Sequence, residues 1–335
     1  MQKNGEPTIA PRKAHAGFSI GVKTGLPLRL ILMRVLIVGC GYVGLALARA
    51  LVGSGHQVYG LRRSSANEST MIEAGIRPLS GDITVPESLP PLDDRFDWVV
   101  NTVSSSRGGL PEYESVYLRG TRNLIEWLSP QPPQRFVYTS STSVYAQQDG
   151  AQVKETSDTE PLSETAKCLL KTEQELLTAF RQRQFPAIIL RVAGIYGPGR
   201  GHRFLQYLRN EARIRGKGDH VLNMIHRDDL VGVIIAALKN ARAGDIYNAV
   251  DDEPVGEVHF FRWLSETLGK WMPPFETGST AEPRKRSATS KRVLNRKLKM
   301  ELGYQFKYPT FRQGYSAEIK RLDDAGELVI APDPR

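Results

Sequence analysis

The chain predicts an α/β protein built on a Rossmann-type doubly wound parallel sheet, with a small C-terminal substrate lobe. Two observations lead to this prediction. Short apolar runs alternate with longer amphipathic runs from residue 33 to about residue 250, as in a parallel sheet whose strands are joined by helices. The first apolar run is followed directly by a glycine-rich turn, which is the arrangement of a dinucleotide site.

The individual elements follow from the apolar periods. Strands are expected at residues 35–38, 57–61, 98–103, 135–139, 187–191 and 245–249, and helices from the glycine turn to about residue 52 and at 113–128, 164–183 and 229–239. After residue 197 the pattern loosens into glycine and proline loops, and after residue 254 into short helices. We therefore expect a nucleotide-binding domain at 33–200, a lobe at 201–320 from which 224–250 returns to the sheet, and a tail at 321–335.

Residues 1–32 form a basic arm, with five basic residues against one acid, Glu6. The arm shows neither a helical nor a strand period, so we expect it to be disordered. Arg29 and Arg34 interrupt the apolar run near residues 26–38, which argues against a signal peptide and against a membrane span. A transit peptide is one interpretation of the arm; we favour a misassigned start, with Met33 as the first native residue.

Composition narrows the class of protein. The two cysteines, Cys40 and Cys168, form neither a disulfide framework nor a metal-ligand spacing, which predicts a cytoplasmic protein without a metal site. The formal net charge is +9, and basic runs stand at residues 284–286 and 291–299. These runs are either a solvated helix face or a lining for an anionic substrate. No aromatic platform or zinc spacing accompanies them, so nucleic-acid binding is not expected.

The glycine turn predicts how a dinucleotide would bind. Gly39 allows a tight turn, Gly41 leaves room for the pyrophosphate, and Gly44 lets the following helix pack closely on the strand. Tyr42 and Val43 begin that helix, whose N-terminus offers free N–H groups and a positive dipole end to the phosphates.

The end of the second strand indicates which dinucleotide. It reads Arg62-Arg63-Ser64, where a carboxylate would bind the ribose hydroxyls of NAD. Two arginines favour the 2′-phosphate of NADP, with NAD as the alternative cofactor and a solvated basic loop as the alternative interpretation. Asp82 and Ile83 stand where a further strand, between those at 57–61 and 98–103, would end, and Asp82 would meet the adenine edge or form a turn.

Several segments in order resemble the extended branch of the short-chain dehydrogenase/reductase superfamily, of the NAD(P)-dependent epimerase/dehydratase type. Besides the glycine turn, they lie at residues 117–124, 136–145, 191–199, 224–230, 246–250, 290–293 and 302–304. The Gly-x-Gly-x-x-Gly spacing is similar to that of the atypical subgroup. The resemblance covers residue 33 to about residue 317. It implies a bound NAD(P), a small-molecule substrate and a homodimer formed through the helices at 113–128 and 164–183.

The resemblance also implies a catalytic Ser and a Tyr-x-x-x-Lys pair. Ser141 stands at the serine position, but Thr165 and Leu169 stand at the tyrosine and lysine positions. Lys167 and Lys171 lie about 200° away around the helix and are expected in solvent. Tyr145 is the candidate that would act with Ser141, or it packs beside the pocket.

Three further positions follow from the resemblance. Tyr117 stands where the family has a helix asparagine, and Ala193 is expected at the nicotinamide end of the site. Asp228 or Asp229 is expected to cap the helix that follows, and His226 is expected to be a loop or core residue.

Two functions fit these residues. The first is an NADP-binding oxidoreductase or epimerase/dehydratase-like enzyme acting on a polar, sugar-linked or nucleotide-linked small molecule. The second is a non-catalytic NADP-binding scaffold or regulatory protein, which the missing Tyr/Lys pair favours. Neither membrane nor nucleic acid is expected as a partner.

Overall fold

The computed structural model describes residues 1–2, 5, 32–64, 68–214, 216–276 and 289–330. The chain divides into two units, Met1–Ile31 and Leu32–Arg335, and every helix and strand below belongs to the second. Most of the expected basic arm, the basic run at 284–286 and the last five residues lie outside the described residues.

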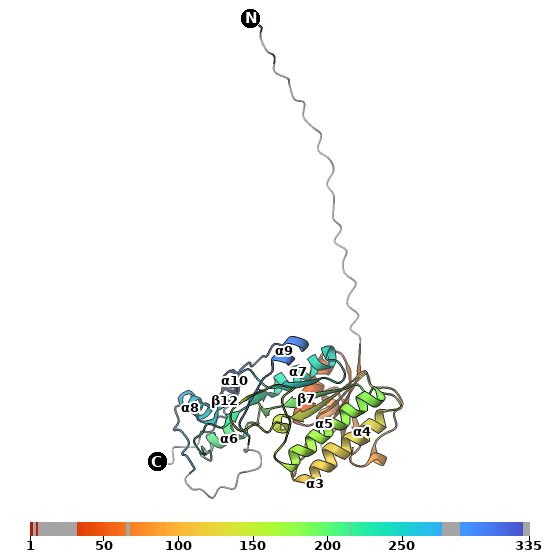
Figure 1. Ribbon diagram of the computed structural model, residues 1–335, viewed down its shortest axis with the longest axis horizontal. Coiled ribbons are helices and arrows are strands. Elements are labelled where there is room, and N and C mark those ends of the chain that lie inside the picture. Colours follow the sequence, from red (N-terminus) through yellow and green to blue (C-terminus); the bar gives the residue numbers. More distant parts are fainter. Residues whose placement is uncertain (3–4, 6–31, 65–67, 215, 277–288, 331–335) are drawn as a thin grey trace. The chain divides into compact units, whose positions relative to one another are not determined.

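Seven parallel strands form the central sheet of this unit (Figure 1). Their order is β3-β2-β1-β4-β5-β7-β11. Because the chain moves outward in both directions from β1 and β4, the sheet is doubly wound, as the sequence predicts. The strands are β1 (Arg34–Val38), β2 (Gln57–Arg62), β3 (Arg77–Ser80), β4 (Trp98–Asn101), β5 (Arg135–Ser141), β7 (Ala187–Val192) and β11 (Ile246–Ala249).

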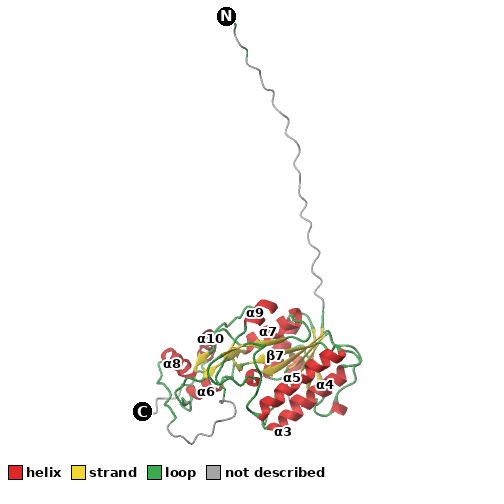
Figure 2. Cartoon of the chain, viewed as in Figure 1, coloured by secondary structure: helices red, strands yellow, loops and turns green. Residues whose placement is uncertain are grey.

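Helices cover both faces of the sheet because successive strand residues point to opposite faces. In β1, Val35 and Ile37 pack in one apolar cluster with α1 (Tyr42–Gly53) and α7 (Arg227–Asn240). Leu36 and Val38 pack in the other cluster with α4 (Gly120–Leu128) and α5 (Glu164–Arg183). Figure 2 shows α4 and α5 side by side on their face of the sheet.

Several expected boundaries differ from the structure, including the following three. The helix expected at 113–128 begins earlier, as α3 (Leu110–Tyr113), and passes through a π-helical turn, η2 (Glu114–Arg119), into α4. Pro111 fits this earlier start, since proline is tolerated in the first helical turn. The strand expected at 98–103 ends at Asn101, and α10 (Phe311–Asp324) crosses the boundary expected at residue 320.

A smaller lobe is formed by elements that lie before and after β11 in the sequence. Its core joins α6 (His202–Leu208), α8 (Glu257–Leu268) and α10 through aromatic side chains such as Phe204, Phe260 and Tyr315. The segment 224–250 returns to the main sheet only through β11, because its first strand, β10 (Met224–His226), pairs with β8 (Gly194–Tyr196). The other short elements are α2 (Glu68–Glu73), η1 (Pro86–Ser88), η3 (Thr142–Val144), β6 (Gln152–Val153), β9 (Val221–Leu222), β12 (Val255–Gly256), β13 (Arg292–Val293) and α9 (Arg296–Leu302).

In the part of the chain that the structure describes, no helix combines the length and the apolar character needed to cross a bilayer.

Candidate functional site

A cleft of about 940 Å³ lies at the carboxyl ends of β1, β2, β4, β5 and β7. This is the edge at which open α/β sheets bind their ligands, next to the point where the strand order reverses. Most of the predicted site residues line this cleft: Gly39, Gly41, Tyr42, Val43, Arg62, Arg63, Asp82, Ile83, Ser141, Thr165, Leu169 and Ala193.

The glycine turn has the backbone that a pyrophosphate site needs. Gly39 adopts a φ of +85°, which favours glycine. A Cβ on Gly44 would lie 2.4 Å from the carbonyl oxygen of Gly39, so helix and strand touch there. A Cβ on Gly41 would meet nothing closer than 4.0 Å, and α1 begins without a side-chain cap. This open glycine and the free helix N-terminus fit the diphosphate of a dinucleotide.

At the carboxyl ends of β2 and β3, the expected basic and acidic residues lie close together. Arg62 ends β2 and pairs in register with Ser80 of β3, which places Asp82 beside the arginines. An Nη atom of Arg63 lies 4.0 Å from a carboxylate oxygen of Asp82. Asp82 also accepts hydrogen bonds from the N–H and the hydroxyl of Thr84, so it forms the turn after β3 while lining the cleft.

Ser141 ends β5 and lines the cleft. Its Oγ accepts a hydrogen bond from the N–H of Ser143 at 3.1 Å and thereby caps η3. Because this contact uses an oxygen lone pair, the hydroxyl hydrogen remains able to donate to a ligand. Thr165 and Leu169 line the same cleft from adjacent turns of α5. The family's tyrosine and lysine positions therefore face the cleft, but neither side chain here can exchange a proton near neutral pH.

Tyr145 is not brought into the cleft. Its side chain is fully buried, and its hydroxyl lies 2.8 Å from Oδ1 of Asn248 and 2.9 Å from Nη1 of Arg191. Burial raises the pKa of this phenol, more than the adjacent guanidinium lowers it. This position agrees with the interpretation in which Tyr145 packs beside the pocket, and not with the one in which it acts with Ser141, since the ring belongs to a buried polar network.

Tyr117 does line the cleft, from the π-helical turn η2. Its hydroxyl oxygen accepts a hydrogen bond from the N–H of Ser105 at 3.1 Å. π-Helical turns are often found at functional sites. The turn places a phenol in the cleft at the position of the family's asparagine.

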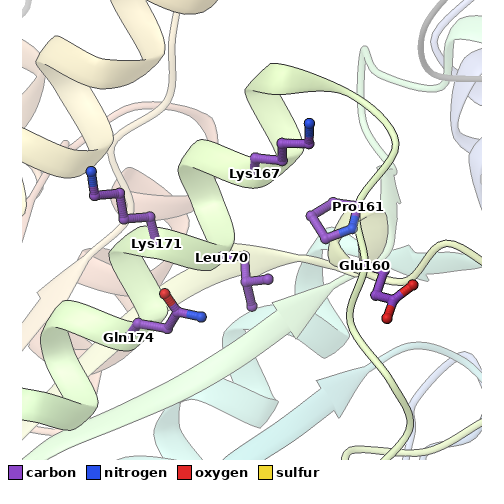
Figure 3. Close-up of a pocket in the computed structure, with 6 residues that line it drawn as sticks. All are labelled: Glu160, Pro161, Lys167, Leu170, Lys171 and Gln174. Atoms are coloured by element: carbon purple, nitrogen blue, oxygen red, sulfur yellow. The ribbon is translucent and has the colours of Figure 1, made fainter.

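Lys167 and Lys171 lie outside the cleft, as the helical rotation predicts. They project from α5 beside a separate small hollow that is also lined by Glu160, Pro161 and Gln174 (Figure 3). Lys167 forms an exposed ion pair with Glu164. Neither lysine replaces the missing catalytic one.

The cap of α7 differs from the expectation. The helix begins at Arg227, and Nδ1 of His226 accepts the N–H of Asp228 at 3.1 Å. Burial lowers the pKa of His226, which favours the neutral ring that can accept this bond. Asp229 lies inside the first turn and accepts bonds from the hydroxyl of Tyr304 and the backbone N–H groups of residues 307 and 308. It anchors the C-terminal segment and does not cap the helix.

The two interpretations of the basic run at 291–299 hold for different residues of the run, as the placement of Lys291 shows. The basic run at 291–299 is not one solvated helix face, because β13 precedes α9 within it. Lys291 is 5% exposed and lines the cleft, whereas Lys299 is exposed and pairs with Asp252. Strand residues alternate in direction, but a two-residue strand gives too short a pattern to detect from the sequence.

In the described residues, no group of three or more His, Cys, Asp or Glu side chains is arranged to hold a metal ion. Cys40 lies in the glycine turn, where burial raises the pKa of its thiol to about 11. This cysteine therefore stays protonated at neutral pH.

Comparison with known proteins agrees with this geometry. A model of the NAD dependent epimerase/dehydratase family matches residues 35–250. The protein therefore belongs to the NAD-dependent epimerase/dehydratase family, with NAD(P)-type chemistry expected at the glycine turn and the cleft beside it.

Individual relatives are more distant. The chain is 28% identical over 285 residues to Protein YeeZ of Escherichia coli K12, covering 82% of this chain and 96% of the relative. It is 25% identical over 323 residues to a 3-diazoavenalumate denitrifying reductase from a Streptomyces species, covering 85% of this chain and the whole of that protein.

Solved structures share the fold. A functionally unknown conserved protein from Silicibacter pomeroyi aligns with a TM-score of 0.71 at 28% identity, covering 87% of this chain and 99% of that one. The dTDP-glucose 4,6-dehydratase DesIV from Streptomyces venezuelae, with NAD and TYD bound, aligns with a TM-score of 0.75 at 22% identity, covering 87% and 97%.

Proposed function

We propose that this protein is an NADP-dependent oxidoreductase of the epimerase/dehydratase family that reduces a polar small molecule bearing a carbonyl group. The observation that carries the proposal is the lining of one cleft. Arg62 and Arg63 line it where the ribose would lie, and Ser141 and Ala193 line it where the nicotinamide would lie. A relative named as a reductase supports a reductive reaction, although the compound in that relative's name is a diazo compound and not a carbonyl compound.

The preference for NADP rests on charge. The end of β2 presents two guanidinium groups and no carboxylate, and Asp82 is the acid that the structure places beside them. A charge-assisted contact to a phosphate contributes about 1.5–3 kcal/mol, which is roughly ten- to a hundredfold in affinity.

Each group of cleft residues would have its own role in the reaction. The glycine turn and the N-terminus of α1 would hold the diphosphate, and the backbone at Ala193 would border the nicotinamide. When NADPH is bound, it supplies the hydride. Ser141 would donate a hydrogen bond to the reacting oxygen, which stabilises the charge that develops there.

A second function has support from one observation. Thr165 and Leu169 occupy the family's acid/base positions in the cleft, which favours a non-catalytic NADP-binding protein. Turnover of the isolated protein separates the two functions, because a binding protein would hold NADPH without oxidising it.

Calorimetric titration with NADPH and NADH tests the cofactor, and single-turnover oxidation of NADPH over a panel of polar aldehydes and ketones tests the reaction. Arg62→Asp should lose ten- to a hundredfold of its NADPH affinity and gain affinity for NADH. Arg49→Asp is the matched control, since Arg49 is exposed on α1 and does not line the cleft. Equal affinities for both cofactors in the wild type contradict the NADP assignment.

A further inference from the structure

The cleft contains a lysine that does not belong to the family's Tyr-x-x-x-Lys pair. Lys291 directly precedes β13, far along the chain from the helix that carries the family's tyrosine and lysine positions. Since Thr165 and Leu169 cannot donate a proton at neutral pH, a reduction in this cleft needs its acid from another element.

The backbone of Lys291 is held close to the nicotinamide end. Its carbonyl oxygen accepts a hydrogen bond from Nδ2 of Asn223 at 2.8 Å, and the carbonyl of Asn223 accepts the N–H of Gly194 at 3.0 Å. Gly194 follows Ala193 in the cleft wall. Two hydrogen bonds therefore connect the lysine to the segment that borders the reacting ring.

The two residues that follow Lys291 are also held in place. Arg292 and Val293 pair in parallel with Gln152 and Val153 of β6, and the N–H of Val293 donates to Oδ1 of Asn223 at 2.8 Å. Because bonds on both sides restrain the backbone, the side chain of Lys291 starts from a defined position.

The surroundings of the ammonium group are unusual for a lysine. Long charged side chains normally bury their stems and leave the charged head in water. Lys291 is 5% exposed, its Nζ donates to Oγ1 of Thr289 at 2.9 Å, and no carboxylate among the described residues lies within 4 Å of it. Burial lowers the pKa of this lysine to about 8.

Stability alone does not explain a buried ammonium group of this kind. A buried charge without a counter-ion disfavours folding, and perturbed ionisable groups in clefts are concentrated at functional sites. A group with a pKa close to the working pH is also an efficient proton donor. Geometry and electrostatics therefore point to the same role.

We propose that Lys291 is the general acid of this cleft and protonates the substrate oxygen while the carbonyl group is reduced. This inference rests on the proposed function. The carbonyl carbon gains a hydride from NADPH, the C=O π bond breaks, and the oxygen takes a proton from Nζ. The products are an alcohol and NADP⁺, and the neutral amine of Lys291 recovers its proton from water.

Two substitutions separate a proton donor from a simple positive charge. Lys291→Met removes both properties, whereas Lys291→Arg keeps the charge but holds its proton too firmly to donate it. Both variants should slow single-turnover NADPH oxidation by about a hundred- to ten-thousandfold. Lys171→Met is the matched control, because Lys171 is an exposed lysine that lies outside the cleft. Full activity in Lys291→Arg would show that only the charge matters and would overturn the proposal.

The pH profile provides a second readout. The wild-type rate should fall above about pH 8, and this limb should be absent from both Lys291 variants. The segment before β9 contributes His220 to the same part of the cleft, while Gln152 and Val153 of β6 do not ionise. His220→Gln should therefore retain the alkaline limb.

A third measurement does not depend on turnover. In protein labelled with ¹⁵N-lysine, one Nζ signal should titrate near pH 8 and should be missing from Lys291→Arg. An Nζ of Lys291 that titrates near the ordinary lysine value of about 10.4 overturns the proposal. A wild type that binds NADPH but reduces no carbonyl compound overturns the proposed function, and the acid role with it. An active wild type matched by Lys291→Met overturns the acid role alone.

Discussion

The guanidinium group of Arg191 lies 2.8 Å from the carboxylate of Glu173, and the two side chains are 4% and 1% exposed. This ion pair joins β7 to α5 beneath the cleft. Ser140 donates its hydroxyl to the same carboxylate at 2.6 Å, and Arg191 donates to the hydroxyl of Tyr145. The pair thus belongs to a network that connects β5, β7 and α5.

Breaking this pair should destabilise the protein strongly. Glu173→Gln leaves the buried guanidinium without a counter-charge, and such a loss costs about 3–5 kcal/mol. Glu175→Gln on the same helix is the control, because the pair between Arg122 and Glu175 is partly exposed and contributes at most about 1 kcal/mol. Urea unfolding of both variants measures the difference. Similar stabilities for the two would show that the buried pair is not what fixes α5.

Substitutions of Tyr145 and Ser141 should affect the stability of the protein and the rate of the reaction differently. Tyr145→Phe leaves Asn248 and Arg191 with an unmet hydrogen bond each, so we expect a loss of about 1–3 kcal/mol and little change in the rate of hydride transfer. Ser141→Ala should give a slower single turnover, with a loss of about 1 kcal/mol from the missing cap of η3. Thermal unfolding and single-turnover assays on both variants check this. A large decrease in rate for Tyr145→Phe, with normal stability, would show that the hydroxyl of Tyr145 takes part in the reaction.

The close contact at Gly44 should be intolerant of a single methyl group. In Gly44→Ala the new Cβ would collide with the carbonyl oxygen of Gly39, so the turn must shift. We expect a loss of about 1–3 kcal/mol and a matching loss of NADPH binding. Gly53→Ala near the end of the same helix meets nothing within 4 Å and should bind NADPH normally. Differential scanning calorimetry measures the stability of the two variants, and cofactor titration measures their NADPH binding. Equal values for Gly44→Ala and Gly53→Ala would show that the turn can relax around the new methyl group.

Lys291 should lower the stability of the fold while it serves the chemistry. A pKa of about 8 in the folded state, against 10.5, corresponds to about 3 kcal/mol of destabilisation at neutral pH. The unfolded chain binds more protons between these two values, so stability rises as the pH rises from about 8 to 10.5. Lys291→Met should therefore raise the free energy of unfolding at pH 7, and the gain should shrink across that pH range. A variant that is less stable than the wild type at pH 7 would contradict this.

The regular part of the fold was predictable because its signals are local. The helix Glu164–Arg183 has the predicted bounds, since Ser163 accepts the N–H of Ala166 at its start and Gln184 adopts a φ of 56° at its end. The positions of the glycine turn and of Arg62 at the end of β2 were likewise predictable, because the apolar runs that precede them are local signals.

The surroundings of Tyr145, Lys291 and His226 were harder to predict, because they depend on contacts between residues that are far apart in the sequence. The burial of Tyr145 follows from contacts with Asn248 and Arg191, which belong to other strands. Lys291 enters the cleft because Arg292 and Val293 pair with β6, and nothing in the local basic pattern reports that pairing. The cap at His226 needs the ring orientation, which the sequence does not specify.

The pairing of β13 with β6 also sets an order of events during synthesis. All seven strands of the main sheet lie before residue 250, whereas Lys291 and β13 leave the ribosome later. Because domains form from the N-terminal side as the chain emerges, the glycine turn and the whole sheet can assemble while one wall of the cleft is still missing. A nascent chain would then gain its capacity to hold a nucleotide before its capacity to act on a substrate.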